Sequence, residues 1–91
     1  MTENKEEVEI LKTKANVLFG EKKYGEAIEV YSKAIEINDN AILRANRAYS
    51  WLKLCHFQNA IEDATKSIQF DSNYFKGFNF HSFQFFTFLF C

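Results

Sequence analysis

Two polar side chains near the start of the chain have the spacing of a shared binding surface. Lys12 and Asn16 are four residues apart, so in a helix they lie on one face and can donate hydrogen bonds to one ligand. Asn46 falls inside another predicted helix, and asparagine is a poor helix former, by several tenths of a kcal/mol relative to alanine. The two asparagines therefore indicate binding, whereas Lys12 alone would be an ordinary residue of a solvated helix face.

The sequence contains no set of residues that would support catalysis. It lacks an Asp/His/Asn metal cluster, a phosphate-binding glycine loop and a Ser-His-Asp set. His56 falls in a predicted turn and His81 near the C-terminal end, and neither has a catalytic partner in the pattern. There is no Cys-x-x-Cys pair, so we expect no metal and no cofactor. The pattern favours a binding protein and not an enzyme.

The net charge limits the classes of partner that we expect, and the first residues bear on the cellular compartment. The formal net charge is −1, which predicts no general affinity for nucleic acid or for an anionic membrane. Residues 1–7 are polar and acidic with no apolar run behind them, which argues against an ordinary signal peptide. We therefore expect a cytoplasmic protein, with the nucleus as an alternative.

The polar residues must be positioned by helices, because the chain repeats itself. An Ala-Ile-Glu sequence begins at Ala27 and again at Ala60, 33 residues later, and a period near 34 is typical of a stacked helix-turn-helix repeat. Apolar spacing predicts helices over 7–20, 24–37, 41–54 and 57–70, and a fifth from about Tyr74. We expect Gly20 to stop the first helix and the turn over 38–40 to cap the third.

Small and apolar residues predict the inward faces. On the first helix we expect Ile10, Leu11, Ala15, Leu18 and Phe19 on one side, and on the fourth Ala60, Ile61, Ala64 and Ile68. Alanines recur at matched places in both copies, where helix axes would come closest: Ala15, Ala27, Ala34, Ala48, Ala60 and Ala64. A bulky side chain there would push the helices apart, although alanine is also simply a good helix former.

These residues resemble the tetratricopeptide repeat family over about residues 7–78. The signature positions are filled by Ala15, Leu18, Ala27, Tyr31 and Ala34 in the first repeat, and by Ala48, Trp51, Ala60, Ala64 and Ser67 in the second. The resemblance implies an all-α fold of antiparallel helix-turn-helix repeats, stacked as a short right-handed solenoid. We expect a disordered acidic segment over 1–6, one repeat over 7–40, a second over 41–73, and over 74–91 the incomplete first helix of a third.

Within the family, the chain is similar to the co-chaperones that hold the C-terminal carboxylate of heat-shock chaperones, including the repeat domain of a serine/threonine phosphatase. The resemblance rests on residues 11–16, 31–36, 45–47, 63–65 and 74–78. It carries the family's carboxylate clamp onto Lys12, Asn16, Asn46 and Lys76. Phe19 is expected either along the same groove or simply in the core.

The clamp of the family also has an arginine, which would fall at position 80. This chain has Phe80 there, and one missing charge-assisted hydrogen bond costs about 2 kcal/mol. The resemblance thus implies a weakened clamp for the acidic C-terminal peptides of heat-shock protein 90 or 70 class chaperones. Two alternatives are a non-catalytic regulatory fragment of a serine/threonine phosphatase-like enzyme, and a self-associating scaffold without clamp activity.

The C-terminal end departs from the family pattern. Residues 77–91 contain no Asp, Glu, Lys or Arg and are crowded with phenylalanine, and such a run is aggregation-prone. We expect this Phe-rich tail to be an unselected sequence from a retained intron, a shifted frame or a mispredicted gene end; the alternative is an apolar patch for self-association. With two repeats and a fraction, we expect a marginal or partly oligomeric fold.

Overall fold

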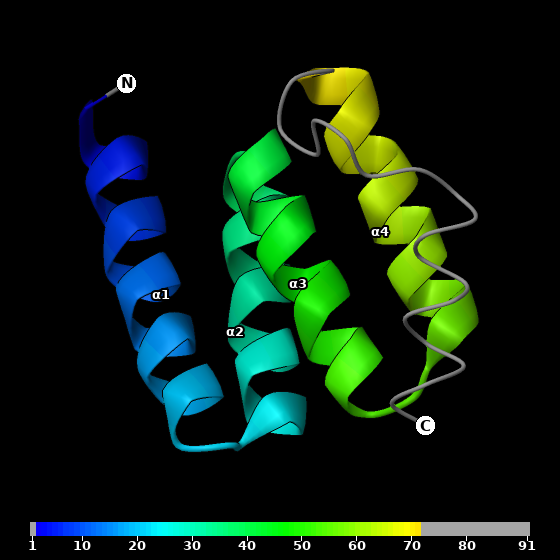
Figure 1. Ribbon diagram of the computed structural model, residues 1–91. Helices are drawn as coiled ribbons and strands as arrows, with labels where there is room; N and C mark the ends of the chain where they lie inside the picture. Colours follow the sequence, from blue (N-terminus) through cyan, green and yellow to red (C-terminus); the bar gives the residue numbers. More distant parts are fainter. Residues whose placement is uncertain (1, 72–91) are drawn as a thin grey trace.

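The protein is a row of four helices, seen in a computed structural model that describes residues 2–71, with side chains from Asn4 onward. The helices are α1 (Thr2–Gly20), α2 (Tyr24–Ile37), α3 (Ala41–Lys53) and α4 (Phe57–Phe70). Each helix packs on the next, α1 on α2, α2 on α3 and α3 on α4, with α1 and α4 at the two sides of the row (Figure 1). This arrangement confirms the predicted all-α architecture of antiparallel helix pairs.

The helix bounds agree with the sequence pattern except at the start of the chain. α2 and α4 have the predicted bounds, and α3 ends at Lys53, one residue early. α1 begins at Thr2, so residues 2–6 are helical where we expected a disordered segment. The acidic segment contains glutamate and lysine, which are good helix formers, and no glycine or proline interrupts it. The predicted fifth helix and the Phe-rich tail lie outside the described residues.

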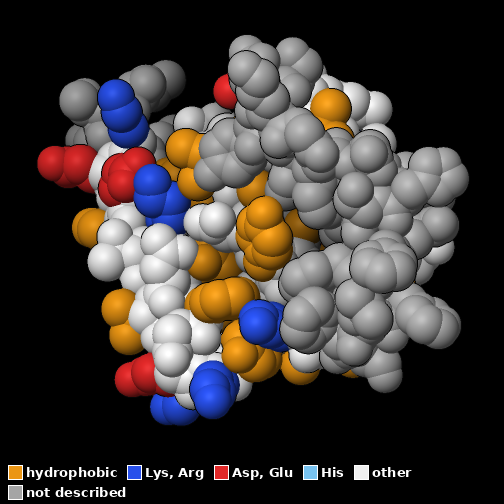
Figure 2. All heavy atoms as spheres, in the orientation of Figure 1, with side chains coloured by type: hydrophobic (Ala, Val, Ile, Leu, Met, Phe, Trp, Pro, Cys, Tyr) orange, Lys and Arg blue, Asp and Glu red, His pale blue; other side chains and the backbone are white. Residues whose placement is uncertain are grey.

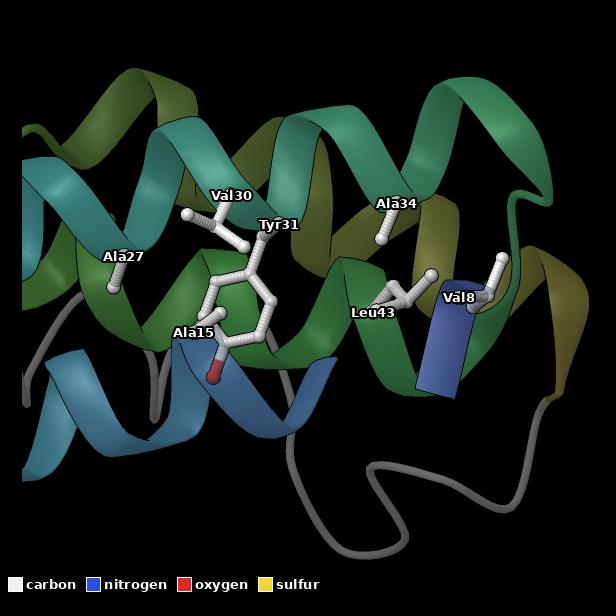
Figure 3. Packing of buried hydrophobic residues seen from close by; sticks show 7 residues of the cluster. All are labelled: Val8, Ala15, Ala27, Val30, Tyr31, Ala34 and Leu43. Atoms are coloured by element: carbon white, nitrogen blue, oxygen red, sulfur yellow. The ribbon is translucent and has the colours of Figure 1, made fainter. Parts of the chain in front are cut away.

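Two apolar clusters form the core, and the small residues lie at their centres. The first joins α1, α2 and the start of α3 and contains Val8, Ala15, Ala27, Val30, Tyr31, Ala34 and Leu43 (Figure 3). The second joins α3 and α4 and contains Ala45, Ala48, Leu52, Ala60 and Ala64. The six recurrent alanines are at most 5% exposed. Close approach of the helices therefore explains their recurrence.

Two isoleucines that we expected inside are exposed. Ile10 is 68% exposed because it stands five residues before Ala15, which places it about 140° around the helix from the buried face. Ile68 is 37% exposed because it follows the buried Ser67 by one residue, about 100° around α4. Val8, seven residues before Ala15, takes the buried place on the first turns of α1.

The two helix pairs turn in the same way. Lys22 and Cys55 have φ angles of 64° and 61°, the left-handed conformation that ends many helices, and they are 33 residues apart. α1 ends at Gly20 as predicted, but the left-handed residue is Lys22 and not the glycine. The same two backbone hydrogen bonds close both turns: Lys22 to Phe19 and Lys23 to Leu18, then Cys55 to Leu52 and His56 to Trp51.

The turn between the pairs is capped by Asn40. Its side-chain oxygen accepts a hydrogen bond from the Leu43 backbone N–H at 2.9 Å, which confirms the predicted cap of α3. None of the helices in the described part combines the length and the apolar character that a membrane span requires.

Candidate functional site

Side chains of α1, α2 and α3 line a hollow of about 400 Å³ on one face of the row. The lining residues are Asn16, Phe19, Tyr31, Asn46 and Tyr49. In the orientation of Figure 1, hydrophobic side chains gather near the middle of the visible face, and lysine or arginine side chains lie beside them (Figure 2). The hollow thus combines aromatic walls with two carboxamide groups.

The structure brings two predicted site residues together from different repeats. The Asn46 Nδ2 group on α3 donates to the Oδ1 atom of Asn16 on α1 at 3.4 Å, across 30 residues of sequence. The hydroxyl of Tyr31, on α2, donates to the same Oδ1 atom. One carboxamide oxygen therefore joins the first three helices at the hollow.

Tyr31 is a site residue that the sequence analysis placed only among the family signature positions. Its ring belongs to the first core cluster beside Ala15, and its hydroxyl points toward α1 (Figure 3). The side chain is buried, and this burial raises the pKa of Tyr31 to about 12. The hydroxyl is therefore a protonated donor at neutral pH. A useful signal in the sequence was available, because a tyrosine inside an apolar stripe needs a partner for its hydroxyl.

Lys12 lies one turn before Asn16 on α1 and is held by a neighbouring acid. Its Nζ atom is 3.3 Å from Oε2 of Glu9, in an i,i+3 ion pair. The side chain of Glu9 is 59% exposed, and such surface pairs contribute little, about 0–1 kcal/mol. Lys12 can thus exchange Glu9 for an anionic ligand. Lys76 lies outside the described residues.

Phe19 combines the two roles between which the sequence could not decide. It is half-buried against the first core cluster, and it also lines the hollow beside Asn16. Its ring meets that of Tyr24 edge-on, with 5.2 Å between the ring centroids. The ring is therefore held in place by the core while part of its surface faces the hollow.

A buried ionic network, which the sequence analysis missed, holds α3 to α4 and α2. Asp63 on α4 is 2% exposed and accepts hydrogen bonds from Arg44 at 2.9 Å and from Arg47 at 2.7 and 2.8 Å. Hydrogen bonds to Asp39, aided by the one to Asp63, raise the pKa of Arg44. Arg47 also donates to the Ser32 hydroxyl on α2 at 2.9 Å. The network fixes the helix that carries Asn46.

An acid within an apolar stripe was the signal for this network. Asp63 stands between Ala60, Ala64 and Ser67, which all face α3. A carboxylate in such a position must be paired, because burying an isolated charge is very costly. Within residues 4–71, no three His, Cys, Asp or Glu side chains come together as a metal site would require.

Comparison with known proteins identifies the fold. Residues 8–41 match the model of the tetratricopeptide repeat. A solved structure, the Arabidopsis OM64 TPR domain, superimposes with a TM-score of 0.77 at 38% identity, over 78% of this chain and 60% of that one. The chain therefore contains a tetratricopeptide repeat, and its four helices share the fold of a solved tetratricopeptide domain. Its repeats form a protein–protein interaction module.

Two longer proteins are similar to most of this chain. Human serine/threonine-protein phosphatase 5 is 45% identical over 71 residues, which are 77% of this chain and 14% of that protein. Heat shock protein STI1 of Saccharomyces cerevisiae is 34% identical over 70 residues, which are 75% of this chain and 12% of that protein. The chain spans a small part of both relatives, and the match to the phosphatase covers its repeat region and not its phosphatase domain.

Proposed function

We propose that the chain binds the acidic C-terminal peptide of a heat-shock protein 90 or 70 class chaperone, with the peptide's terminal carboxylate held by a clamp. The observation that carries this proposal is the meeting of Asn16 and Asn46 at the hollow. The Oδ1 atom of Asn16 is turned inward to two donors. Its NH₂ group therefore faces outward and can donate to an anionic ligand.

Charge and neighbouring apolar surface support the same ligand. Lys12 adds an ammonium group one turn from Asn16, and hydrogen bonds between charged groups are about twice as strong as neutral ones. Phe19 and Tyr49 offer apolar contact for a peptide side chain next to the carboxylate. The similarity to a protein named heat shock protein STI1 supports a chaperone as the source of the peptide. Lys76 completes the proposed clamp, and Phe80 weakens it.

An NMR titration of the isotopically labelled chain tests the proposal. The ligand is an acidic peptide ending in Glu-Glu-Val-Asp, once with a free terminal carboxylate and once amidated. We expect dispersed peaks that shift at Lys12, Asn16, Asn46 and Lys76 with the free acid only. Dispersed peaks that respond to neither peptide would refute the clamp.

A pair of alanine variants locates the binding site within this titration. Asn16→Ala removes the outward NH₂ group and should weaken binding of the free acid about tenfold or more, because a hydrogen bond to a charged group contributes about 1.5–3 kcal/mol. Asn59→Ala is the control, since it removes an exposed asparagine of α4 that does not line the hollow. Equal affinities of the two variants would place the peptide elsewhere.

The similarity to the phosphatase favours a second candidate role. We propose as the alternative that the chain is the non-catalytic regulatory part of a longer phosphatase-like protein. Sequencing of transcripts across the codons for Lys76 and Gly77 tests it. A longer reading frame with a metallophosphatase motif supports this role, and a well-supported exon through the Phe-rich tail opposes it.

A further inference from the structure

We infer that Tyr31 is a positioning residue that makes the site prefer a carboxylate over a carboxamide, by fixing which way the Asn16 side chain is turned. The inference rests on the proposed function, since it concerns the same hollow. Tyr31 lies largely beneath that hollow and acts through Asn16, so it is not itself proposed to hold the carboxylate.

The hydrogen bonds around Asn16 decide the orientation of its carboxamide. Its Oδ1 atom has two lone pairs, and two donors point at it, the Tyr31 hydroxyl and the Asn46 Nδ2 group. A carboxamide turned by half a revolution would place its NH₂ group against the NH₂ group of Asn46. With Asn46 held as it is, two donors would then face each other. The buried Tyr31 hydroxyl could still accept from the turned NH₂ group, but its own proton would lose the acceptor that Oδ1 provides, so the observed orientation is the stable one.

The orientation makes the open side of Asn16 a pure donor. With the oxygen engaged, both hydrogens of the exposed Asn16 NH₂ group are directed away from Tyr31 and Asn46. Lys12 on the same helix face is also only a donor. An ionised carboxylate only accepts hydrogen bonds, whereas a carboxamide brings an NH₂ group of its own. The ligand group that fits is therefore a carboxylate, such as that of a free chain end.

Tyr31 contributes more to this orientation than Asn46 does. The Asn46 bond is long, at 3.4 Å, and the Asn46 side chain is only half-buried. The Tyr31 side chain is 2% exposed, and its ring is packed among the alanines of the first core cluster. Its hydroxyl therefore cannot move away from Asn16. Without this hydroxyl, one weak hydrogen bond would hold the carboxamide, and both orientations would be populated.

The test compares Tyr31→Phe with Tyr24→Phe, which removes a hydroxyl from the same helix and keeps the aromatic ring that meets Phe19. Affinity is measured for the acidic peptide with a free and with an amidated end. For Tyr31→Phe we expect binding of the free acid to weaken about fivefold, the value of one ordinary hydrogen bond. Binding of the amidated peptide should not weaken, so the acid-to-amide ratio falls. An unchanged ratio in Tyr31→Phe would overturn the inference, and Tyr24→Phe should leave the ratio as it is.

A readout without peptide separates this inference from the proposed function. The Asn16 side-chain resonances, including the carboxamide carbon, should move in Tyr31→Phe and stay in place in Tyr24→Phe. Unmoved Asn16 resonances in Tyr31→Phe would overturn the positioning role even if the wild-type chain binds the free acid. In the Asn16→Ala background, Tyr31→Phe should change the affinity no further. A wild-type chain whose Asn16 responds to Tyr31→Phe but which binds neither peptide would refute the proposed function alone.

Discussion

Lys12 is the one described lysine of the proposed clamp, and its availability depends on Glu9. The two side chains form an ion pair at 3.3 Å near the site. An incoming carboxylate must replace Glu9 or share Lys12 with it. Because Glu9 is mostly exposed and the pair is weak, the exchange costs little. Glu9 therefore lowers the affinity of the proposed clamp for a carboxylate only slightly and does not prevent binding.

Replacing this acid gives the first prediction. Glu9→Gln should raise the affinity for the free-acid peptide about twofold, because the Lys12 ammonium no longer has a competing partner. Isothermal titration calorimetry at moderate salt measures the change. Glu29→Gln, an exposed glutamate of α2, is the control for net charge. A rise of the same size in both variants would show a long-range charge effect and not the release of Lys12.

The raised pKa of Tyr31 gives a prediction about alkaline stability. Its folded-state pKa of about 12 exceeds the ordinary value of 10.0, so the folded chain keeps the proton that the unfolded chain loses. The stability is present in full below about pH 10 and is lost as the pH rises toward about 12. Urea denaturation at several pH values should show the free energy of unfolding falling more steeply in the wild type than in Tyr31→Phe. Parallel pH profiles would contradict this assignment.

At the element scale, α3 is locked to its neighbours by charge as well as by alanine packing. Asp63 accepts hydrogen bonds from Arg44 and Arg47, and Arg47 also donates to the Ser32 hydroxyl on α2. The ionic network therefore connects three helices, α2, α3 and α4. Removing one member of a buried ion pair leaves an uncompensated charge, and this usually costs more than the pair contributed.

Asp63→Asn should destabilise the fold by about 3 kcal/mol, because two guanidinium groups lose their shared carboxylate while the volume is conserved. Glu62→Gln, the neighbouring exposed acid on α4, is the control and should change stability by less than about 0.5 kcal/mol. Chemical denaturation monitored by circular dichroism compares the two. Equal stability of the two variants would mean that the ionic network contributes little.

The left-handed turn after α1 predicts a substitution that should stabilise the fold. Lys22 has a φ of 64°, a conformation that is strained for a side chain with a Cβ atom and free of strain for glycine. Lys22→Gly should therefore stabilise the fold by about 1 kcal/mol. Lys23→Gly, one residue on with a φ of −93°, should not stabilise it. A loss of stability in Lys22→Gly would show that the lysine side chain has a role of its own.

At the scale of the whole molecule, the described helices form a row in which each contacts chiefly its neighbours. Stability in such stacks is roughly a sum over repeats and the interfaces between them. The two helix pairs that the structure describes provide few terms in this sum, and apolar surface remains on α4, where Phe70 is 53% exposed. A modest free energy of unfolding follows.

We therefore expect thermal unfolding below about 65 °C, within the mesophile range, with a midpoint that rises with protein concentration if copies associate. Calorimetry at two concentrations, with sedimentation to define the oligomeric state, makes the measurement. A sharp, concentration-independent transition of a monomer above about 65 °C would contradict this expectation.

Most of the fold was predictable because repeats encode it locally. The period and the alanines are local patterns, and they located α2 and α4 correctly. Ile10 was misplaced because apolar character alone does not determine which face of the helix a residue occupies, and Ile10 lies about 140° around α1 from Ala15. Lys22 could not be predicted as the left-handed residue, because glycine two positions earlier is the usual choice for that conformation.

Two of the candidate site residues carried a signal in the sequence, and the residues that support them carried less of one. Asn16 and Asn46 carried a signal because each sits unexpectedly inside a helix. Tyr31 and the arginines of α3 were missed because their partners come from other helices, and composition along one helix does not reveal which partner it meets. Positions 76 and 80 lie outside the described residues, so the part of the clamp assigned to Lys76 stays a prediction.

The order of the helices in the row also determines which helix of the candidate site unfolds locally at the lower free energy. α1 is at one side of the row and packs chiefly on α2, whereas α3 is packed on both sides (Figure 1). Amide hydrogens of α1 should thus exchange through local fraying, at a lower free energy than those of α3. Since Asn16 is on the first helix and Asn46 on the third, a ligand that bridges them would slow exchange along α1. Peptide capture would then appear as protection of a whole helix and not only of the residues that contact the peptide.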